Sequence, residues 1–335
     1  MAGERAQAID DFLGAAGWAA VQPTVLAADA SFRRYYRLID GERRAVLMDA
    51  PPPHEDVRPF VAVAGMLRGH GLSAPEIFAE DHELGLLLVE DFGDDTYTRL
   101  IARGADEAEL YMLAIDTLVA LQRAAAVPPE LPPYDEDRLL GEAALLTDWY
   151  AAEILGAPLA PALREEYLAL WRDALAPAVL PGETLVLRDY HVDNLMLLPG
   201  REGVRRCGLL DFQDAVVGPA SYDLASLLKD ARRDVPAALC TAMTERYLAA
   251  LPGIDRGAFR RSAAILAAQR NAKIIGIFTR LWRRDGKPQY LGHIPRVWRL
   301  LEADLHEPAL RKLQAWLDRH LPRAARRIPD RRSAA

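Results

Sequence analysis

The chain has 335 residues, of which 51% are hydrophobic and 27% are charged, and its net charge is −7. This composition is typical of a globular protein large enough for two lobes, and the negative charge argues against nucleic acid as the main partner. Two cysteines cannot build a disulfide framework, and neither a secretory leader nor a membrane-spanning apolar run is evident, which favours a cytoplasmic protein without a membrane partner.

The first 92 residues predict a small antiparallel sheet accompanied by helices. Strand composition alternates with one helical pattern, and a hairpin turn signal stands at Asp40-Gly41. The expected elements are a helix over 4–18, strands over 31–39 and 44–48, a helix over 56–70, and strands over 76–79 and 84–90.

After residue 93 the pattern becomes mostly helical. Proline pairs at 128–129 and 132–133 predict breaks, and the basic tail over 323–335 is expected to be frayed. The expected helices run over 96–103, 106–126, 137–155, 161–175, 236–251, 257–276, 293–303 and 307–320.

Three polar residues carry the strongest chemical signal in the chain. Asp189 is followed five residues later by Asn194, and Asp211 comes after an apolar, strand-like run. Phosphoryl transfer needs these groups, because one carboxylate accepts the proton of the attacking hydroxyl while an amide and a second carboxylate hold Mg²⁺ against nucleotide phosphates. Residues 195–198 and 206–210 predict a hairpin that would bring Asn194 beside Asp211. The alternative is an ordinary hairpin with surface carboxylates at its ends.

The residues that follow Asp211 introduce a family resemblance. Residues 211–225 resemble the pattern that follows the metal-binding aspartate in the aminoglycoside phosphotransferase family, which also holds choline kinase relatives. The resemblance implies Asp189 as catalytic base and Asn194 and Asp211 as Mg²⁺ ligands. It implies Asp223, at the start of a helix, as a structural anchor beneath the catalytic loop.

The same resemblance implies a fold and a division of labour. The expected fold is α+β and protein-kinase-like, with a small antiparallel-sheet N-lobe over 1–92 and a larger, mostly helical C-lobe over 93–335. The N-lobe would bind the nucleotide, and the C-lobe would carry the catalytic loop, the metal site and the acceptor site. ATP and Mg²⁺ are therefore the expected cofactors.

The hinge of such a kinase would follow the strand over 84–90. Backbone groups of Glu90, Asp91 and Phe92 would then hydrogen-bond the edge of the adenine. The alternative is a buried strand that simply leaves the core at Gly93, and the two interpretations are compatible because a hinge uses backbone rather than side chains.

The phosphate-binding part departs from the family pattern. Met48 stands where a kinase normally carries a lysine, and residues 27–31 contain no glycine for a phosphate loop. Arg33 and Arg34 are the nearest sources of positive charge, and Ser31 would add a hydroxyl or backbone contact. The alternative is that both arginines are solvated strand charges.

The acceptor is predicted from charge in the helical part. Residues 256–299 contain eleven Lys or Arg and one acid, which favours an anionic or neutral acceptor over a polycation. Arg270 and Lys273 share a helix face with Asn271 adjacent, and Arg270 could bind a carboxylate bidentately. His191 could hydrogen-bond a sugar hydroxyl or pack beneath the loop. The charges could equally solvate a helix face.

A narrower resemblance agrees with this charge pattern. Residues 46–52, 187–194 and 273–280 resemble the anomeric N-acetylmuramate/N-acetylglucosamine kinases of cell-wall recycling, in which a Met at the lysine position is usual. The resemblance implies transfer of phosphate from ATP to the C1 hydroxyl of the sugar. The lactyl carboxylate of N-acetylmuramate would account for a basic pocket.

Three other functions remain open on sequence grounds. The first is another kinase of the same fold, acting on an antibiotic, an amino alcohol or a different sugar. The second is a nucleotide-binding regulator without catalysis, which the missing lysine and glycine loop would favour. The third is a helical scaffold, which leaves Asp189, Asn194 and Asp211 unexplained.

Overall fold

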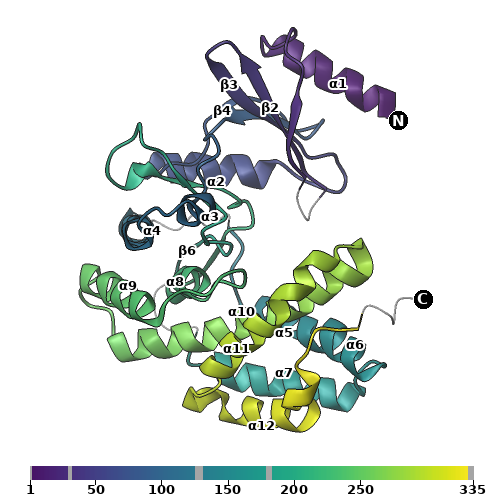
Figure 1. Cartoon of the computed structure of the whole chain (residues 1–335), viewed down its shortest axis with the longest axis vertical. Helices are drawn as coiled ribbons and strands as arrows, with labels where there is room; N and C mark the ends of the chain where they lie inside the picture. Colours follow the sequence, from purple (N-terminus) through teal and green to yellow (C-terminus); the bar gives the residue numbers. More distant parts are fainter. Residues whose placement is uncertain (1, 29–31, 125–130, 179–182, 331–335) are drawn as a thin grey trace. The chain divides into compact units, whose positions relative to one another are not determined.

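The chain folds into two compact units, described in turn from a computed structural model (Figure 1). The first unit comprises residues 1–117 and 192–214, and the second comprises 118–191 and 215–335. The lobe boundary predicted between residues 92 and 93 separates a nucleotide-binding part from a catalytic part of the chain, and this division stays a prediction. The structure describes residues 2–28, 32–124, 131–178 and 183–330.

A five-stranded antiparallel sheet forms the centre of the first unit. The strand order is β1-β2-β3-β5-β4, and β2 and β3 form the hairpin predicted at Asp40-Gly41. The edge strand β1 was not predicted, because its short run of small residues lacks a clear alternation. The strands are β1 (Thr24–Ala28), β2 (Arg34–Asp40), β3 (Arg43–Asp49), β4 (Ile77–Asp81) and β5 (Leu86–Glu90).

One face of this sheet is covered by the N-terminal helix α1 (Ala2–Ala15) (Figure 1). Leu13 of the helix and Trp18 just after it pack in one buried cluster with Leu47 and Leu88 of the strands. Since side chains alternate along a strand, Met48 points to the opposite face of the sheet.

The first unit also contains two helices and a hairpin that position polar groups. Helix α2 (Arg58–Gly69) buries Phe60 and other apolar residues along one side. Helix α3 (Tyr97–Ala102) begins at Thr96, whose hydroxyl accepts a hydrogen bond from the backbone N–H of Arg99. Strands β7 (Leu195–Leu197) and β8 (Cys207–Leu209) form the hairpin.

The second unit is mainly helical and is organised around α10. A small sheet of β6 and β9 accompanies the helices, and α4 enters the unit from the first one. The elements are α4 (Glu107–Ala124), α5 (Glu136–Leu145), a π-helical segment (Leu146–Ala151), α6 (Ala152–Leu155), α7 (Pro161–Leu175), β6 (Glu183–Val186), β9 (Val216–Pro219), α8 (Ser221–Leu228), α9 (Ala237–Ala250), α10 (Arg256–Asp285), α11 (Ile294–Asp304) and α12 (Arg311–His320).

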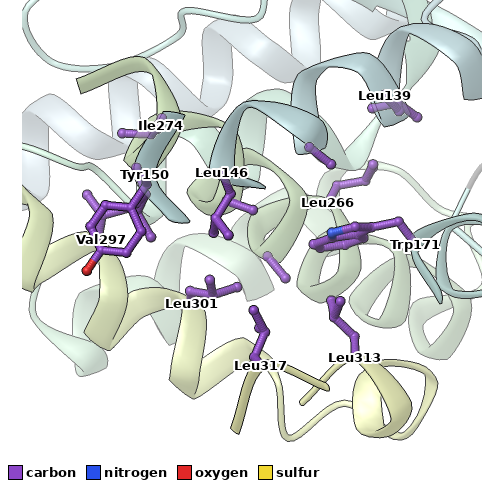
Figure 2. Packing of buried hydrophobic residues seen from close by; sticks show 14 of the residues in the cluster. Leu139, Leu146, Tyr150, Trp171, Leu266, Ile274, Val297, Leu301, Leu313 and Leu317 are labelled. Atoms are coloured by element: carbon purple, nitrogen blue, oxygen red, sulfur yellow. The ribbon is translucent and has the colours of Figure 1, made fainter. Parts of the chain in front are cut away.

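The core of the second unit is a single apolar cluster. Figure 2 shows Leu266 of α10 and Leu313 of α12 on either side of Trp171 of α7, with Leu146 of the π-helical segment and Leu301 of α11 in the same apolar cluster. Such interdigitation of side chains from several helices fixes α10 firmly in place. That rigidity matters because α10 also carries polar residues predicted for the acceptor site.

The α+β class predicted from the sequence is confirmed, and several element boundaries are corrected. The helix expected over 137–155 is interrupted by the π-helical segment, and the helix expected over 257–276 continues to Asp285. Strands β6 and β9 were also not predicted. None of the helices in the described part of the chain combines the length and the apolar character needed to span a membrane.

Candidate active site

The β7–β8 hairpin brings two of the predicted site residues together. Its register pairs Leu195 with Leu209, and the backbone N–H of Leu210 donates to the carbonyl oxygen of Asn194 at 3.0 Å. Asp211 follows directly, so that its Oδ2 lies 3.4 Å from Nδ2 of Asn194. The amide and the carboxylate therefore form one polar cluster, as the hairpin predicted from the sequence requires.

The backbone of Asp211 adopts an uncommon conformation. Its φ is +57°, in the left-handed region that aspartate tolerates better than most residues. The conformation is held by neighbours: Nε2 of Gln213 donates to Oδ1 of Asp211 at 2.8 Å, and Phe212 stacks on Phe60 of α2 with ring centroids 4.8 Å apart. The carboxylate is thus aimed by packing on one side and by a hydrogen bond on the other.

Arg33 lies next to this carboxylate. Its Nη1 is 3.8 Å from Oδ1 of Asp211, and its Nε donates to Oε2 of Glu55 at 2.9 Å. Burial works to lower the pKa of Arg33, but Tyr35, Glu55 and Asp211 together raise it above its ordinary value. Arg33 is therefore a fixed, permanently charged group at the edge of the polar cluster.

The other residues predicted around the phosphates are placed differently. Arg34 begins β2 with an exposed side chain. Ser31 lies outside the described residues. The first lysine in the sequence is Lys229, so every permanent cation of the first unit is an arginine. This makes Arg33 the best-placed cation beside Asp211 among the residues that the structure describes.

A cavity of about 360 Å³ opens beside Asn194 and Asp211 in the first unit. Its walls are mainly apolar, and Met48 lies among the lining residues with 1% of its surface exposed. The apolar lining residues include Leu26, Val46, Met48, Phe60, Val89, Met196 and Leu210. A mainly apolar cavity whose lining also includes the amide of Asn194 and the carboxylate of Asp211 suits a purine base that continues into a charged tail.

The predicted hinge residues Glu90, Asp91 and Phe92 also line this cavity. The Asp91 carboxylate accepts from the guanidinium of Arg37 and from the N–H of Gly93, which braces the segment. Phe92 packs against Gly208 of β8 so closely that a Cβ at Gly208 would lie 2.9 Å from its ring. These contacts hold the side chains of Asp91 and Phe92 in place, and the role of residues 90–92 as a hinge stays a prediction.

The chain just before Asp189 is held by Asp223 in the second unit. Oδ2 of Asp223 accepts from the N–H of Leu187 at 2.7 Å, and Oδ1 accepts from the N–H of Arg188 at 2.9 Å. Arg188 has a φ of +68°, which costs a residue of this size on the order of 1–2 kcal/mol. The two hydrogen bonds and one from Ser226 to the carbonyl of Arg188 over-determine this strained turn.

The surroundings of Asp189 favour its ionised form. Burial works to raise the pKa of this half-buried carboxyl, but Lys273 first, and then His191 and Arg270, lower it below its ordinary value. A carboxylate kept ionised beside cations can accept a hydrogen bond from an alcohol. Asp189 therefore has the charge state that a general base requires.

The residues predicted for the acceptor lie in the second unit and are all buried. Nε2 of His191 is 3.3 Å from Nη1 of Arg232, and Nδ2 of Asn271 is 3.5 Å from Oδ2 of Asp304. Arg270 is 4% exposed, and its Nη1 has no hydrogen-bond partner among the described residues.

Lys273 is already engaged by a residue that the sequence did not single out. Its Nζ donates to Oε1 of Glu142 at 2.9 Å, and Glu142 also pairs with Arg188. Burial works to raise the pKa of Glu142, but Lys273 and Arg188 hold it below its ordinary value. The partners of Glu142 are 46 and 131 residues away, so that no local pattern could have indicated this residue.

The excess of basic residues over 256–299 is largely balanced in the folded unit. Eight of the eleven form ion pairs, mostly with acids from outside that stretch. Examples are Arg283 with Glu153 and Arg296 with Asp234. The number of basic residues over 256–299 therefore does not by itself predict a basic acceptor pocket. Selective binding of an anion would depend on particular residues in that stretch.

Asn194 and Asp211 suit a magnesium ion. Mg²⁺ prefers oxygen ligands and usually takes one or two from the protein, with phosphates and water supplying the rest. One carboxylate and one amide that can turn its oxygen outward meet this requirement. Among the described residues no group of three or more His, Cys, Asp or Glu could hold a metal ion, which is compatible with a metal held jointly with a nucleotide.

Comparison with known sequences gives matches over most of the chain. Residues 23–261 match the model of the phosphotransferase enzyme family. A protein of Caulobacter vibrioides named N-acetylmuramate/N-acetylglucosamine kinase is 39% identical over an alignment of 363 residues, which covers 98% of this chain and 99% of that protein. A protein of the same name from Pseudomonas aeruginosa is 44% identical over 313 residues, which cover 89% of each chain.

Solved structures with the same fold share little sequence with the chain. A choline/ethanolamine kinase family protein from Mesorhizobium loti has a TM-score of 0.63 at 17% identity, covering 96% of this chain and 99% of its own. A choline kinase from Streptococcus pneumoniae has a TM-score of 0.63 at 14% identity, covering 90% and 99%. These structures confirm the predicted kinase-like fold.

Proposed function

Because the chain belongs to the phosphotransferase enzyme family, we propose that it transfers the γ-phosphoryl group of ATP to the anomeric hydroxyl of N-acetylmuramate. N-acetylglucosamine would be a second acceptor, and the products would be the sugar 1-phosphates used in peptidoglycan recycling. The observation that carries the proposal is the pairing of Asn194 with Asp211 at the end of an apolar cavity, in a chain whose relatives bear this activity in their names.

The nucleotide would bind in the first unit. The adenine would lie on the apolar walls near Met48, with its edge hydrogen-bonded by the backbone of residues 90–92. Asn194 and Asp211 would hold Mg²⁺, which neutralises phosphate charge when bound. Arg33, held by Glu55, would supply the positive charge that a lysine at position 48 supplies in other kinases.

Asp189 would act as the base. A lowered pKa keeps this carboxylate ionised at neutral pH, and it would accept the proton of the attacking hydroxyl. An anomeric hydroxyl belongs to a hemiacetal and is more acidic than an ordinary alcohol, which eases the transfer. General base catalysis of this kind contributes roughly 10²- to 10⁴-fold, and positioning would supply much of the remaining acceleration.

The acceptor sugar would be selected in the second unit. Arg270 is the best candidate for the lactyl carboxylate of N-acetylmuramate, because it is buried and one of its guanidinium nitrogens lacks a described partner. A buried arginine can bind a carboxylate through two parallel hydrogen bonds. His191 would bind a sugar hydroxyl. Lys273 and Asn271 would support the site without contacting the sugar, since Lys273 is bound to Glu142 and Asn271 to Asp304.

A phosphorus NMR assay with several acceptors tests the proposal. The chain would be incubated with ATP, Mg²⁺ and, separately, N-acetylmuramate, N-acetylglucosamine, choline and an aminoglycoside, with Asp189→Asn as the control for contaminating kinases. We expect a phosphate signal coupled to the anomeric proton with the two sugars and no product from the variant. A phosphate on another hydroxyl would contradict the proposal, and retained nucleotide binding without any product would support a regulator.

A further inference from the structure

Glu142 of α5 is the centre of a buried polar cluster in the second unit. Its side chain is 12% exposed, and it accepts hydrogen bonds from groups on three other segments. Nζ of Lys273 donates to Oε1 at 2.9 Å, the hydroxyl of Tyr134 donates to Oε2 at 2.5 Å, and Nε2 of Gln269 lies 3.3 Å from Oε2. The guanidinium of Arg188 completes the set.

Two of these partners connect Glu142 to the base. Arg188 precedes Asp189 in the chain, occupies the strained turn described above, and lies over the ring of Tyr134 at 5.6 Å. Lys273 is the group that does most to offset the effect of burial on the charge state of Asp189. Glu142 therefore binds both the residue next to the base and the cation that acts on it most strongly.

We propose that Glu142 is a positioning residue for Asp189, in an assignment that rests on the proposed function. Its carboxylate binds both the Lys273 ammonium and the Arg188 guanidinium, so that these two cations keep fixed positions around Asp189. Without Glu142, the long and flexible side chain of Lys273 would leave the place from which its ammonium keeps Asp189 ionised, and Arg188 next to the base would lose its ion pair.

A purely structural role is the competing explanation, because removing one member of a buried ion pair destabilises most proteins strongly. The two roles differ in a variant that loses both partners. In Glu142→Gln/Lys273→Met one negative and one positive charge disappear, so the net buried charge stays constant and stability should return. A structural role predicts that activity returns with stability, whereas a positioning role predicts that it does not.

The experiment measures kcat, KM for ATP and melting temperature for Glu142→Gln, Lys273→Met and the double variant. We expect both single variants to lower kcat by about tenfold or more, with KM for ATP within about twofold of the parent value. The double variant should recover most of the melting temperature while kcat stays as low as in the slower single variant. Recovery of kcat together with the melting temperature would overturn the proposal.

The control is Glu136→Gln on the same helix. Glu136 also forms an ion pair, with Arg172, but its side chain is 48% exposed and lies outside the cluster. This variant should keep kcat and the melting temperature of the parent. A loss of kcat equal to that of Glu142→Gln would mean that any charge lost from α5 disturbs catalysis, and the proposal would fail.

A second measurement does not depend on which acceptor is used. The chain has four lysines, so the nitrogen-15 signal of the Lys273 ammonium can be assigned with Lys273→Met. Glu142→Gln should shift this signal, and Asp189→Asn should then shift it less than Asp189→Asn does in the parent, because the ammonium is no longer held facing the base. If Glu142→Gln left the Lys273 signal unchanged, the proposal would be wrong. If the parent did not phosphorylate either sugar, that result would count against the proposed function alone.

Discussion

Arg33 and Met48 show how a positive charge for the phosphates can come from a different sequence position than in other kinases. The first unit has no lysine, Met48 is buried in the cavity wall, and Arg33 lies beside Asp211 just before β2 begins. Glu55 holds Arg33 as an acid often holds a phosphate-binding lysine in kinases. Positive charge is therefore available to a nucleotide tail although the expected lysine is missing.

Arg33→Met should weaken productive nucleotide binding. Loss of a charge-assisted hydrogen bond to a phosphate costs about 1.5–3 kcal/mol, so kcat/KM for ATP should fall about 10- to 100-fold. Steady-state kinetics with varied MgATP would measure this fall. Arg34→Met is the matched control, because Arg34 is exposed, and it should stay close to the parent. Equal losses in both variants would show that Arg33 has no special role.

His191 gives the stability a pH dependence. Burial, followed by the neighbouring cation Arg232, lowers its pKa to about 4, against an ordinary value of 6.5. Between these values the unfolded chain binds a proton that the folded chain rejects, so the stability contribution of His191 is complete above about pH 6.5 and falls as the pH drops towards 4. This contribution should fall by on the order of 2 kcal/mol between pH 7 and pH 5. Asp223 and Asp304 act in the opposite direction over the same range, because burial raises their pKa values to about 7 and about 6.

Urea unfolding at several pH values would measure this slope. His191→Gln should remove the His191 contribution from the slope of the parent, because the substituted side chain takes up no proton in either state. His306→Gln, at an exposed position, should leave the slope of the parent intact. If the two variants had the same slope, His191 would not be the group responsible.

The positions of some candidate site residues were predictable from the sequence, while their roles stay predictions. Asn194 and Asp211 meet through a short hairpin, and Asp223 stands where the family pattern places it, so local order was sufficient. Glu55 and Glu142 were not found, because the arginine and lysine that pair with them lie 22 to 131 residues away and a lone glutamate in a charged stretch carries no signal. Burial and long-range pairing, rather than residue type, distinguish these two acids.

At the scale of the elements, close packing of α10 on α5 explains a glycine in the middle of a long helix. A Cβ at Gly276 would lie 2.2 Å from the carbonyl carbon of Leu145, at the point where α5 passes into the π-helical segment. The contact is with backbone, so the neighbouring chain would have to shift rather than a side chain turn aside. The glycine thus permits the approach of the two helices.

Gly276→Ala should therefore destabilise the chain, by about 1–3 kcal/mol if the core accommodates the clash as overpacked cores usually do. Gly141→Ala is the control on α5, where an added Cβ meets nothing within 4 Å and the better helix propensity of alanine should give about 0.5–1 kcal/mol of stability. Thermal unfolding of both variants would measure the difference. A neutral Gly276→Ala would contradict the close approach described here.

Helices and strands were predictable to different degrees. Helices with a clear apolar period, such as α7, were found at their observed limits, since the period is a local property. Strands β1, β6 and β9 have four or five residues each, too few for an alternation to stand out. The basic stretch over 256–299 suggested a charged face, yet most of its charges pair with acids that are distant in sequence.

For the whole molecule, the cavity proposed to bind the nucleotide is lined entirely by residues from the first unit. A ligand that binds the folded chain and not the unfolded chain raises its stability by mass action, by about 2.7 kcal/mol at a hundred times its Kd. MgATP should therefore raise the melting temperature, and chelation of Mg²⁺ with EDTA should remove most of that rise. The melting temperature without nucleotide should not respond to EDTA.

Hydrogen exchange would localise this effect. Protection by MgATP should fall on β3, β5 and the β7–β8 hairpin, whereas α7 and α12 should exchange as before. Asp211→Ala is the control, because it removes the carboxylate of the proposed metal site and should abolish the dependence on Mg²⁺. Protection of α12 as strong as that of β5 would contradict a nucleotide site in the first unit.

The absence of lysine from the first unit has a practical consequence for chemical proteomics. Acyl-phosphate derivatives of ATP and similar amine-reactive affinity labels identify kinases by modifying the ammonium group beside the bound triphosphate. At this cavity they would meet the thioether of Met48 and the guanidinium of Arg33, neither of which such electrophiles acylate readily. Such labels would find no lysine in the first unit of this enzyme, so its detection by amine capture would depend on a lysine of the second unit.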